Sequence, residues 1–233
     1  MGKQFFDLKM ITTYILIFLL FLSFTLIGNH GVTVFSGKMN NESTVVIDAG
    51  HGGVDSGAIS CTGAYESQIN LQVAKILDDL MHLLGMKTIM IRDTDKSIYT
   101  EGDTIAAKKV SDIRNRVALV NETPQAFLIS IHQNHFSDSR YHGSQVFYNG
   151  QEESADIAQN LQQAFCRYID PGNNRKIKKV RGVYLMEHIN CPGVLIECGF
   201  LSNSKEELQL RDHRYQQKLC CVIASVICQY LNT

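Results

Sequence analysis

The stretch that decides the fold is "VVIDAGHGGVDSGAISCTGAYES", residues 45–67. It opens on a short apolar run that stops at Asp48, as a buried strand does where it leaves a sheet. His51 follows with a glycine on each side, and a loop of small residues then leads to Glu66. The loop is either ordinary turn material or a means of bringing His51 and Glu66 to one point.

Apolar periodicity predicts that helices and strands alternate along the rest of the chain. We expect helices at residues 66–84, 105–121, 152–168, 204–212 and 215–231. Short apolar runs predict strands at residues 44–48, 87–92, 126–132, 143–150 and 192–200. Such alternation is typical of α/β proteins. The predicted fold class is therefore a single α/β domain, with a twisted, largely parallel mixed sheet of about six strands and helices on both faces.

A hydrophobic segment precedes this domain. Residues 10–27 carry no charge, and as a helix they would span about 27 Å, close to the thickness of a bilayer core. Lys3 and Lys9 precede the segment, and the next basic residue is Lys38, which predicts an exported body. No clear cleavage site follows, so an uncleaved anchor is favoured over a cleaved signal peptide. The predicted divisions are an anchor or signal segment at 1–28, a linker at 29–43 and the folded domain at 44–233.

Composition narrows the functional classes. The formal net charge of −1 gives no basic field for nucleic acid. The seven cysteines are odd in number and contain no C-x-x-C pair, so they do not indicate a disulfide framework. We expect most of them to be small buried side chains.

Three ionisable residues stand at or just past the ends of predicted strands: His51, His132 and Glu197. In α/β sheets the chemistry lies at the carboxyl ends of the strands. Two histidines and one carboxylate form a common catalytic zinc set. The glycines around His51 permit the close approach that would bring Glu66 into that set. We therefore predict a metal site made of His51, Glu66 and His132.

Glu197 is the predicted proton carrier. It follows an apolar run, where burial would raise the pKa of its carboxyl toward neutrality. Asp48 or Asp55 could accept the second imidazole N–H of a ligand histidine and so orient it.

Four motifs in this order resemble the zinc-dependent N-acetylmuramoyl-L-alanine amidases: "VVIDAGHGGVDSGA", "YES", "LISIHQNH" and "VLIECGFLSN". The resemblance covers residues 45 to about 231. It implies one zinc ion held by His51, Glu66 and His132, with Glu197 as the catalytic carboxylate. It also implies hydrolysis of the peptidoglycan amide between the lactyl group of N-acetylmuramic acid and the L-alanine of the stem peptide.

The short form of the domain, its N-terminal hydrophobic segment, and "SIHQNHF", "YHGSQVFY" and "DPGNNR" resemble the germination-specific amidases of spore formers. That subgroup implies action in the spore cortex, where stem peptides are removed so that muramic-δ-lactam can form. The alternatives are a vegetative cell-wall amidase or autolysin, a zinc exopeptidase, and a catalytically silent wall-binding protein. The expected partners are peptidoglycan, the membrane through the N-terminal segment, and a protein activator that the sequence does not identify. The expected location is the extracytoplasmic face, including the spore cortex space.

Five further residues have predictions of their own. Asn134 and Arg181 are candidates for substrate binding, although the basic run that ends at Arg181 is also typical of a solvated loop. His135 stands where the resembled family has a small residue; it is a spare ligand, a substrate contact or an exposed side chain. Arg92 and Arg116 are predicted to make structural ion pairs or helix-terminus contacts.

Overall fold

The computed structural model describes residues 43–231. Its six strands form one sheet in the order β2-β1-β3-β6-β4-β5. Their bounds are Thr44–Ala49 for β1, Lys87–Met90 for β2, Ala126–Asn134 for β3, Gln145–Tyr148 for β4, Lys178–Lys179 for β5 and Gly193–Phe200 for β6. Strands β2, β1, β3 and β6 are parallel to one another, whereas β4 runs antiparallel to β6 and parallel to β5. The predicted fold class is therefore confirmed.

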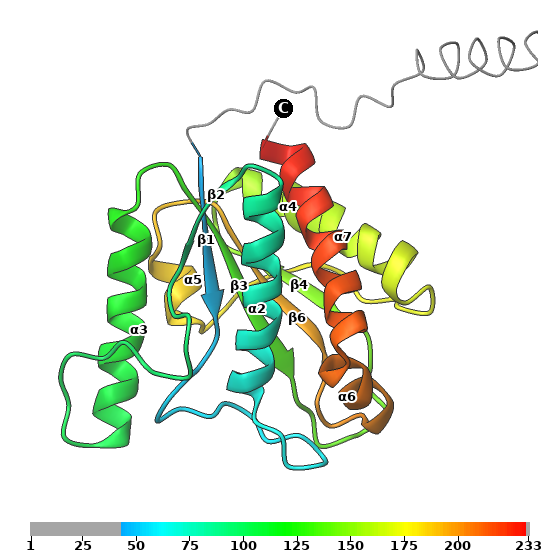
Figure 1. The fold of residues 1–233 in the computed structure, drawn as a ribbon, viewed down its shortest axis with the longest axis horizontal. Helices are drawn as coiled ribbons and strands as arrows, with labels where there is room; N and C mark the ends of the chain where they lie inside the picture. Colours follow the sequence, from blue (N-terminus) through cyan, green and yellow to red (C-terminus); the bar gives the residue numbers. More distant parts are fainter. Residues whose placement is uncertain (1–42, 232–233) are drawn as a thin grey trace, which may run out of the picture. The chain divides into compact units, whose positions relative to one another are not determined.

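Helices cover both faces of the sheet (Figure 1). Their bounds are Glu66–Leu83 for α2, Ile105–Glu122 for α3, Glu152–Ala164 for α4, Tyr184–His188 for α5, Ser204–Arg211 for α6 and His213–Leu231 for α7. In the view of Figure 1, α2 and α7 lie side by side in front of the sheet and α5 lies behind it. Helix α4 continues as a π-helical turn at Phe165–Ile169.

Alternating side chains of the central strands supply two apolar cores. Val45, Ile47 and Ala49 of β1 belong to the larger core, together with buried residues of α2, α4 and α7. Val46 lies in the smaller core with residues such as Leu185 of α5. The same alternation directs Asp48, His132 and Glu197 to the face of the smaller core. That face therefore carries the ionisable side chains at the carboxyl end of the sheet.

The structure adds two elements that the sequence pattern did not predict. Strand β5 has two residues and α5 has five, and so short an element shows no periodicity. The predicted strand at 87–92 ends earlier, at Met90. The cysteines are all free, but only Cys198, Cys220 and Cys228 are fully buried, while Cys61 and Cys221 are exposed. The expectation that most of them are buried thus holds only for those three.

Across residues 43–231, none of the helices has the length and apolar character needed to cross a membrane. The predicted segment at 1–28 and the linker up to residue 42 lie outside the described residues.

Candidate metal centre

The structure brings His51, Glu66 and His132 together. They come from the turn after β1, the first residue of α2 and the seventh residue of β3. Each offers one donor atom, and these atoms lie within 4.8 Å of one another. His51 Nε2 lies 3.3 Å from Glu66 Oε2, and His132 Nδ1 lies 3.0 Å from Glu66 Oε1. Within the described part of the chain, no other such group of histidine, cysteine and acidic side chains converges.

A tight turn presents His51. Its backbone is left-handed, with φ of 62°, and Gly52 and Asp55 close the turn through two backbone hydrogen bonds of 2.7 and 3.0 Å. The Asp55 carboxylate lies 2.8 Å from His51 Nδ1, which leaves Nε2 directed toward Glu66. Burial opposes protonation of this imidazole, but Asp55 and Glu66 outweigh it and raise the pKa of His51 to about 9. Asp55 therefore occupies the orienting position predicted for either Asp48 or Asp55.

Asp48 has a different role. The buried Arg116 pairs with Asp48 and Asp112, and Asp48 also accepts a 2.6 Å hydrogen bond from the Ser130 hydroxyl. Burial alone would raise the pKa of Asp48, but the Arg116 charge keeps it below the ordinary value. Asp48 does not orient a histidine because its carboxylate is turned to Arg116.

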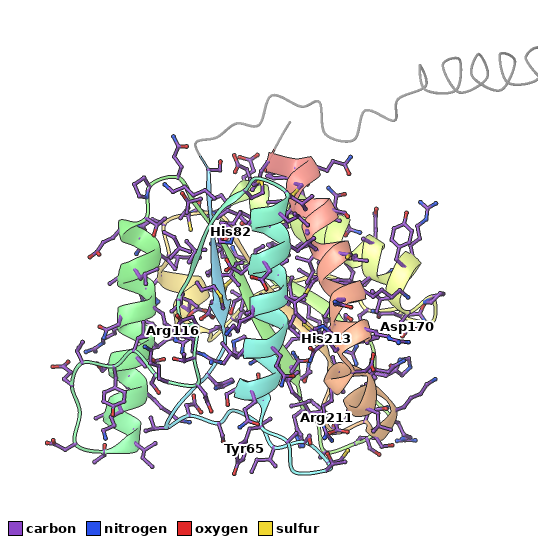
Figure 2. All side chains as sticks on the ribbon, viewed as in Figure 1. Tyr65, His82, Arg116, Asp170, Arg211 and His213 are labelled. Carbon is purple, nitrogen blue, oxygen red and sulfur yellow. The ribbon has the colours of Figure 1, made fainter. Side chains whose placement is uncertain are left out.

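Two buried arginines fix the backbone on which His51 sits. Arg116, on α3 beside the end of β1 (Figure 2), donates to the carbonyl of His51 at 2.7 Å. Arg92 donates to the carbonyls of Ala49 and Gly50 at 2.7 and 3.0 Å. Charge-assisted hydrogen bonds of this kind are stronger than neutral ones. Arg116 makes the predicted structural ion pairs, whereas Arg92 is structural through hydrogen bonds to backbone carbonyls and forms no ion pair with the described residues. Both arginines support the candidate metal centre.

Glu66 is 4% exposed and its carboxylate is held from several sides. Its two oxygens accept from the backbone N–H of Ala58 at 2.9 Å, the backbone N–H of Gln133 at 3.2 Å and the Asn70 amide at 3.2 Å. Burial would raise the pKa of Glu66, but His132 and His51 hold it well below the usual range. The group is therefore an ionised carboxylate, the form that binds a metal.

Glu197 lies beside this cluster, and one of its carboxyl oxygens has no hydrogen-bond partner among the described residues. In the register of β3 and β6 it stands opposite His132. Its Oε2 atom is buried and accepts no hydrogen bond from the described residues. Burial raises the pKa of Glu197 to about 7, although the neighbouring His132 charge opposes this. A bound dication would lower it. An orphaned carboxylate next to two imidazoles and a second carboxylate fits a three-ligand zinc site with an open position.

Gly50 is needed because the His132 ring lies against it. A Cβ atom at this position would lie 2.2 Å from His132 Cε1 and Nε2. The Gly50 backbone itself does not adopt a positive φ, so close approach rather than turning explains this glycine.

We expect Gly50→Ala to weaken zinc binding by about 10- to 100-fold, the loss typical of displacing a ligand's support. Competition with a chromophoric chelator measures the affinity. Gly150→Ala is the matched control, because its Cβ would meet only the Lys179 side chain, at 3.5 Å. Equal affinities of the two variants would contradict the expectation.

The remaining predicted site residues fall in different places. Asn134 ends β3 two residues beyond His132 and so faces the same side. His135 is exposed and is not part of the cluster. Arg181 follows β5. This strand pairs with β4, and both run away from the cluster. The structure does not bring Arg181 to the candidate metal centre.

Sequence reasoning missed Asn70. Its amide donates to Glu66 Oε1 at 3.2 Å and to the Gly50 carbonyl at 3.1 Å, and Gln133 in turn donates to Asn70 at 3.1 Å. The sequence does carry a signal for this contact. Asn70 is a polar residue on the buried face of the predicted helix, one helical turn after Glu66, where the two side chains can meet.

Comparisons with known proteins point to one family. Residues 45–229 match the family described as N-acetylmuramoyl-L-alanine amidase. A relative in Bacillus subtilis, the germination-specific N-acetylmuramoyl-L-alanine amidase, is 35% identical over 190 residues, covering 81% of this chain and 79% of the relative. The CwlD amidase of Clostridioides difficile, solved in complex with the GerS lipoprotein, superposes with a TM-score of 0.78 at 37% identity, covering 81% of this chain and 98% of that one. LytC of Bacillus subtilis is 26% identical and is covered over 38% of its length.

Proposed function

The chain belongs to the N-acetylmuramoyl-L-alanine amidase family and is a peptidoglycan amidase, and we propose that it works as a single-zinc hydrolase of the spore cortex. The bond cleaved is the amide between the lactyl group of N-acetylmuramic acid and the L-alanine of the stem peptide. The observation that carries the mechanism is the half-buried Glu197 beside the His51, Glu66 and His132 cluster, because its buried Oε2 atom has no hydrogen-bond partner among the described residues.

His51, Glu66 and His132 would hold the zinc ion. When bound, zinc supplies a Lewis acid that polarises the amide carbonyl and lowers the pKa of water. Asp55 keeps His51 Nε2 aimed at the cluster by pairing with Nδ1 at 2.8 Å.

Glu197 would move the proton. Its carboxylate takes a proton from the attacking water and delivers it to the amide nitrogen as the carbon–nitrogen bond breaks. The products are a free lactyl carboxylate on muramic acid and a peptide with a free N-terminal alanine. A pKa raised by burial suits both steps, because the group must accept and then release a proton near neutral pH.

Two relatives support the cortex assignment, a germination-specific amidase similar in sequence and the CwlD amidase similar in structure. We propose that residues 44–233 form the catalytic domain, that 29–43 is a linker, and that 1–28 anchors the chain for action on the extracytoplasmic side. The CwlD amidase was solved with a lipoprotein, and a partner of that class is proposed here also. Loss of muramic-δ-lactam from spores that lack the chain would support the role; unchanged δ-lactam would favour a vegetative amidase.

Metal removal tests the mechanism. We expect chelator treatment to reduce muropeptide digestion to background, because the ligand cluster then has no ion, and added zinc to restore it. Mass spectrometry of the products should show new muramic acid ends and free N-terminal alanine. Digestion unaffected by chelator would exclude the zinc mechanism, and release of single amino acids from peptide ends would favour an exopeptidase.

A further inference from the structure

Arg175 is a half-buried cation that forms no ion pair with a carboxylate of residues 43–231 within 4.0 Å. Glu206 acts on it only at longer range. Both oxygens of Glu206 accept backbone N–H groups, from Gly143 and Phe200, at 2.9 Å each. Arg175 therefore has no carboxylate of the described residues in direct contact, although the Glu206 charge acts on it from farther away.

The guanidinium is nevertheless held in one position. Nε donates to the His142 carbonyl at 2.7 Å and Nη1 donates to Gln145 Oε1 at 3.2 Å. The group also lies over the Phe200 ring, 4.4 Å from its centre. Nη2 donates to none of the described residues. A fixed guanidinium with a free donor edge is prepared for a bound anion, because little side-chain entropy remains to be lost.

Strand register places this guanidinium on the same side of the sheet as the proposed catalytic group. His132, Glu197 and Gln145 stand opposite one another on three neighbouring strands, so their side chains share one face of the sheet. Gln145 then holds Arg175. From these spacings Arg175 lies on the order of 10 Å from the Glu197 carboxylate. An extended peptide advances at most about 3.3–3.6 Å per residue, so two or three residues cover this distance.

We propose that Arg175 binds a free carboxylate on the second or third residue of the stem peptide, counted from the L-alanine of the scissile amide. This rests on the proposed amidase function and adds a selectivity to it. Arg175 forms a charge-assisted hydrogen bond to a carboxylate oxygen. Conversion of that carboxylate to a primary amide removes the charge, so that the hydrogen bond from Arg175 to the remaining carbonyl oxygen is weaker. Arg175 thus makes the enzyme prefer unamidated over amidated stem peptides.

Three muramoyl-tripeptides test the proposal with the full-length, zinc-loaded chain. One carries free carboxylates at residues two and three, and the other two carry an amide at one of these positions. We expect the wild type to show about 10- to 100-fold lower kcat/KM on one of the amidated substrates, mainly through KM. Arg175→Gln should hydrolyse all three at one low kcat/KM, and Arg175→Lys should keep part of the preference.

Arg214→Gln is the matched control, since it removes an exposed arginine at the start of α7. It should keep the wild-type preference. The ratio between substrates in one preparation does not depend on the folded fraction, so a stability loss cannot imitate the result. The proposal would be overturned if the wild type hydrolysed all three substrates with equal kcat/KM. It would also be overturned if Arg175→Gln lost the same factor on all three substrates and so kept the wild-type preference. If the wild type hydrolysed none of them, the amidase function itself would fail, and the proposal with it.

Discussion

Glu197→Gln is expected to lower kcat on muropeptides by about 10²- to 10⁴-fold, the contribution typical of a positioned acid–base group. Glutamine keeps the shape of the side chain but cannot take a proton from water and pass it to the leaving nitrogen. The three proposed ligands are untouched, so zinc content should remain that of the wild type. The measurements are steady-state kinetics together with metal analysis of the same preparation.

The control for Glu197→Gln is Glu122→Gln, which removes an exposed carboxylate at the end of α3. It should leave both kcat and zinc content unchanged. A variant at Glu197 that retained nearly wild-type kcat would rule out the proposed proton carrier. Loss of zinc together with activity would instead make Glu197 part of the ligand set.

The position of Glu197 could be predicted because the signal for it lies in the residues directly around it. Strands β1, β3 and β6 are short apolar runs, and a polar residue that interrupts such a run near its carboxyl end is unusual unless it is used. Parallel α/β topology then brings those ends to one edge. The sequence alone therefore places three residues at the carboxyl edge of the sheet: His51, His132 and Glu197.

The support of the site could not be predicted in the same way. The hydrogen bonds from Arg92 and Arg116 to the backbone at residues 49–51 join segments more than 40 positions apart. No periodicity encodes such a contact. The antiparallel placement of β4 is equally non-local, yet it sets Gln145 opposite Glu197 and so positions Arg175. The sequence instead predicts a substrate-binding arginine at Arg181, because its pattern shows only the local charge density.

Glu66→Gln is expected to weaken zinc binding by more than about 100-fold, since even the partners of ligands cost 10- to 100-fold. The change removes the one negative charge among the three proposed ligands. It also introduces a conflict, because the two oxygens accept from the backbone N–H groups of Ala58 and Gln133. Wherever the new amide nitrogen sits, it faces a donor. Equilibrium dialysis with metal analysis measures the loss.

Glu206→Gln separates a lost ligand from a lost structural contact. Glu206 is also buried and also accepts two backbone N–H groups, at 2.9 Å each, so its replacement meets the same donor conflict. Both variants should unfold at lower temperature, but only Glu66→Gln should lose zinc. If both kept one zinc ion per chain at wild-type affinity, Glu66 would be a structural acceptor like Glu206. The loop after His51 would then be an ordinary turn, because it would bring Glu66 to the end of β1 without adding a third metal ligand.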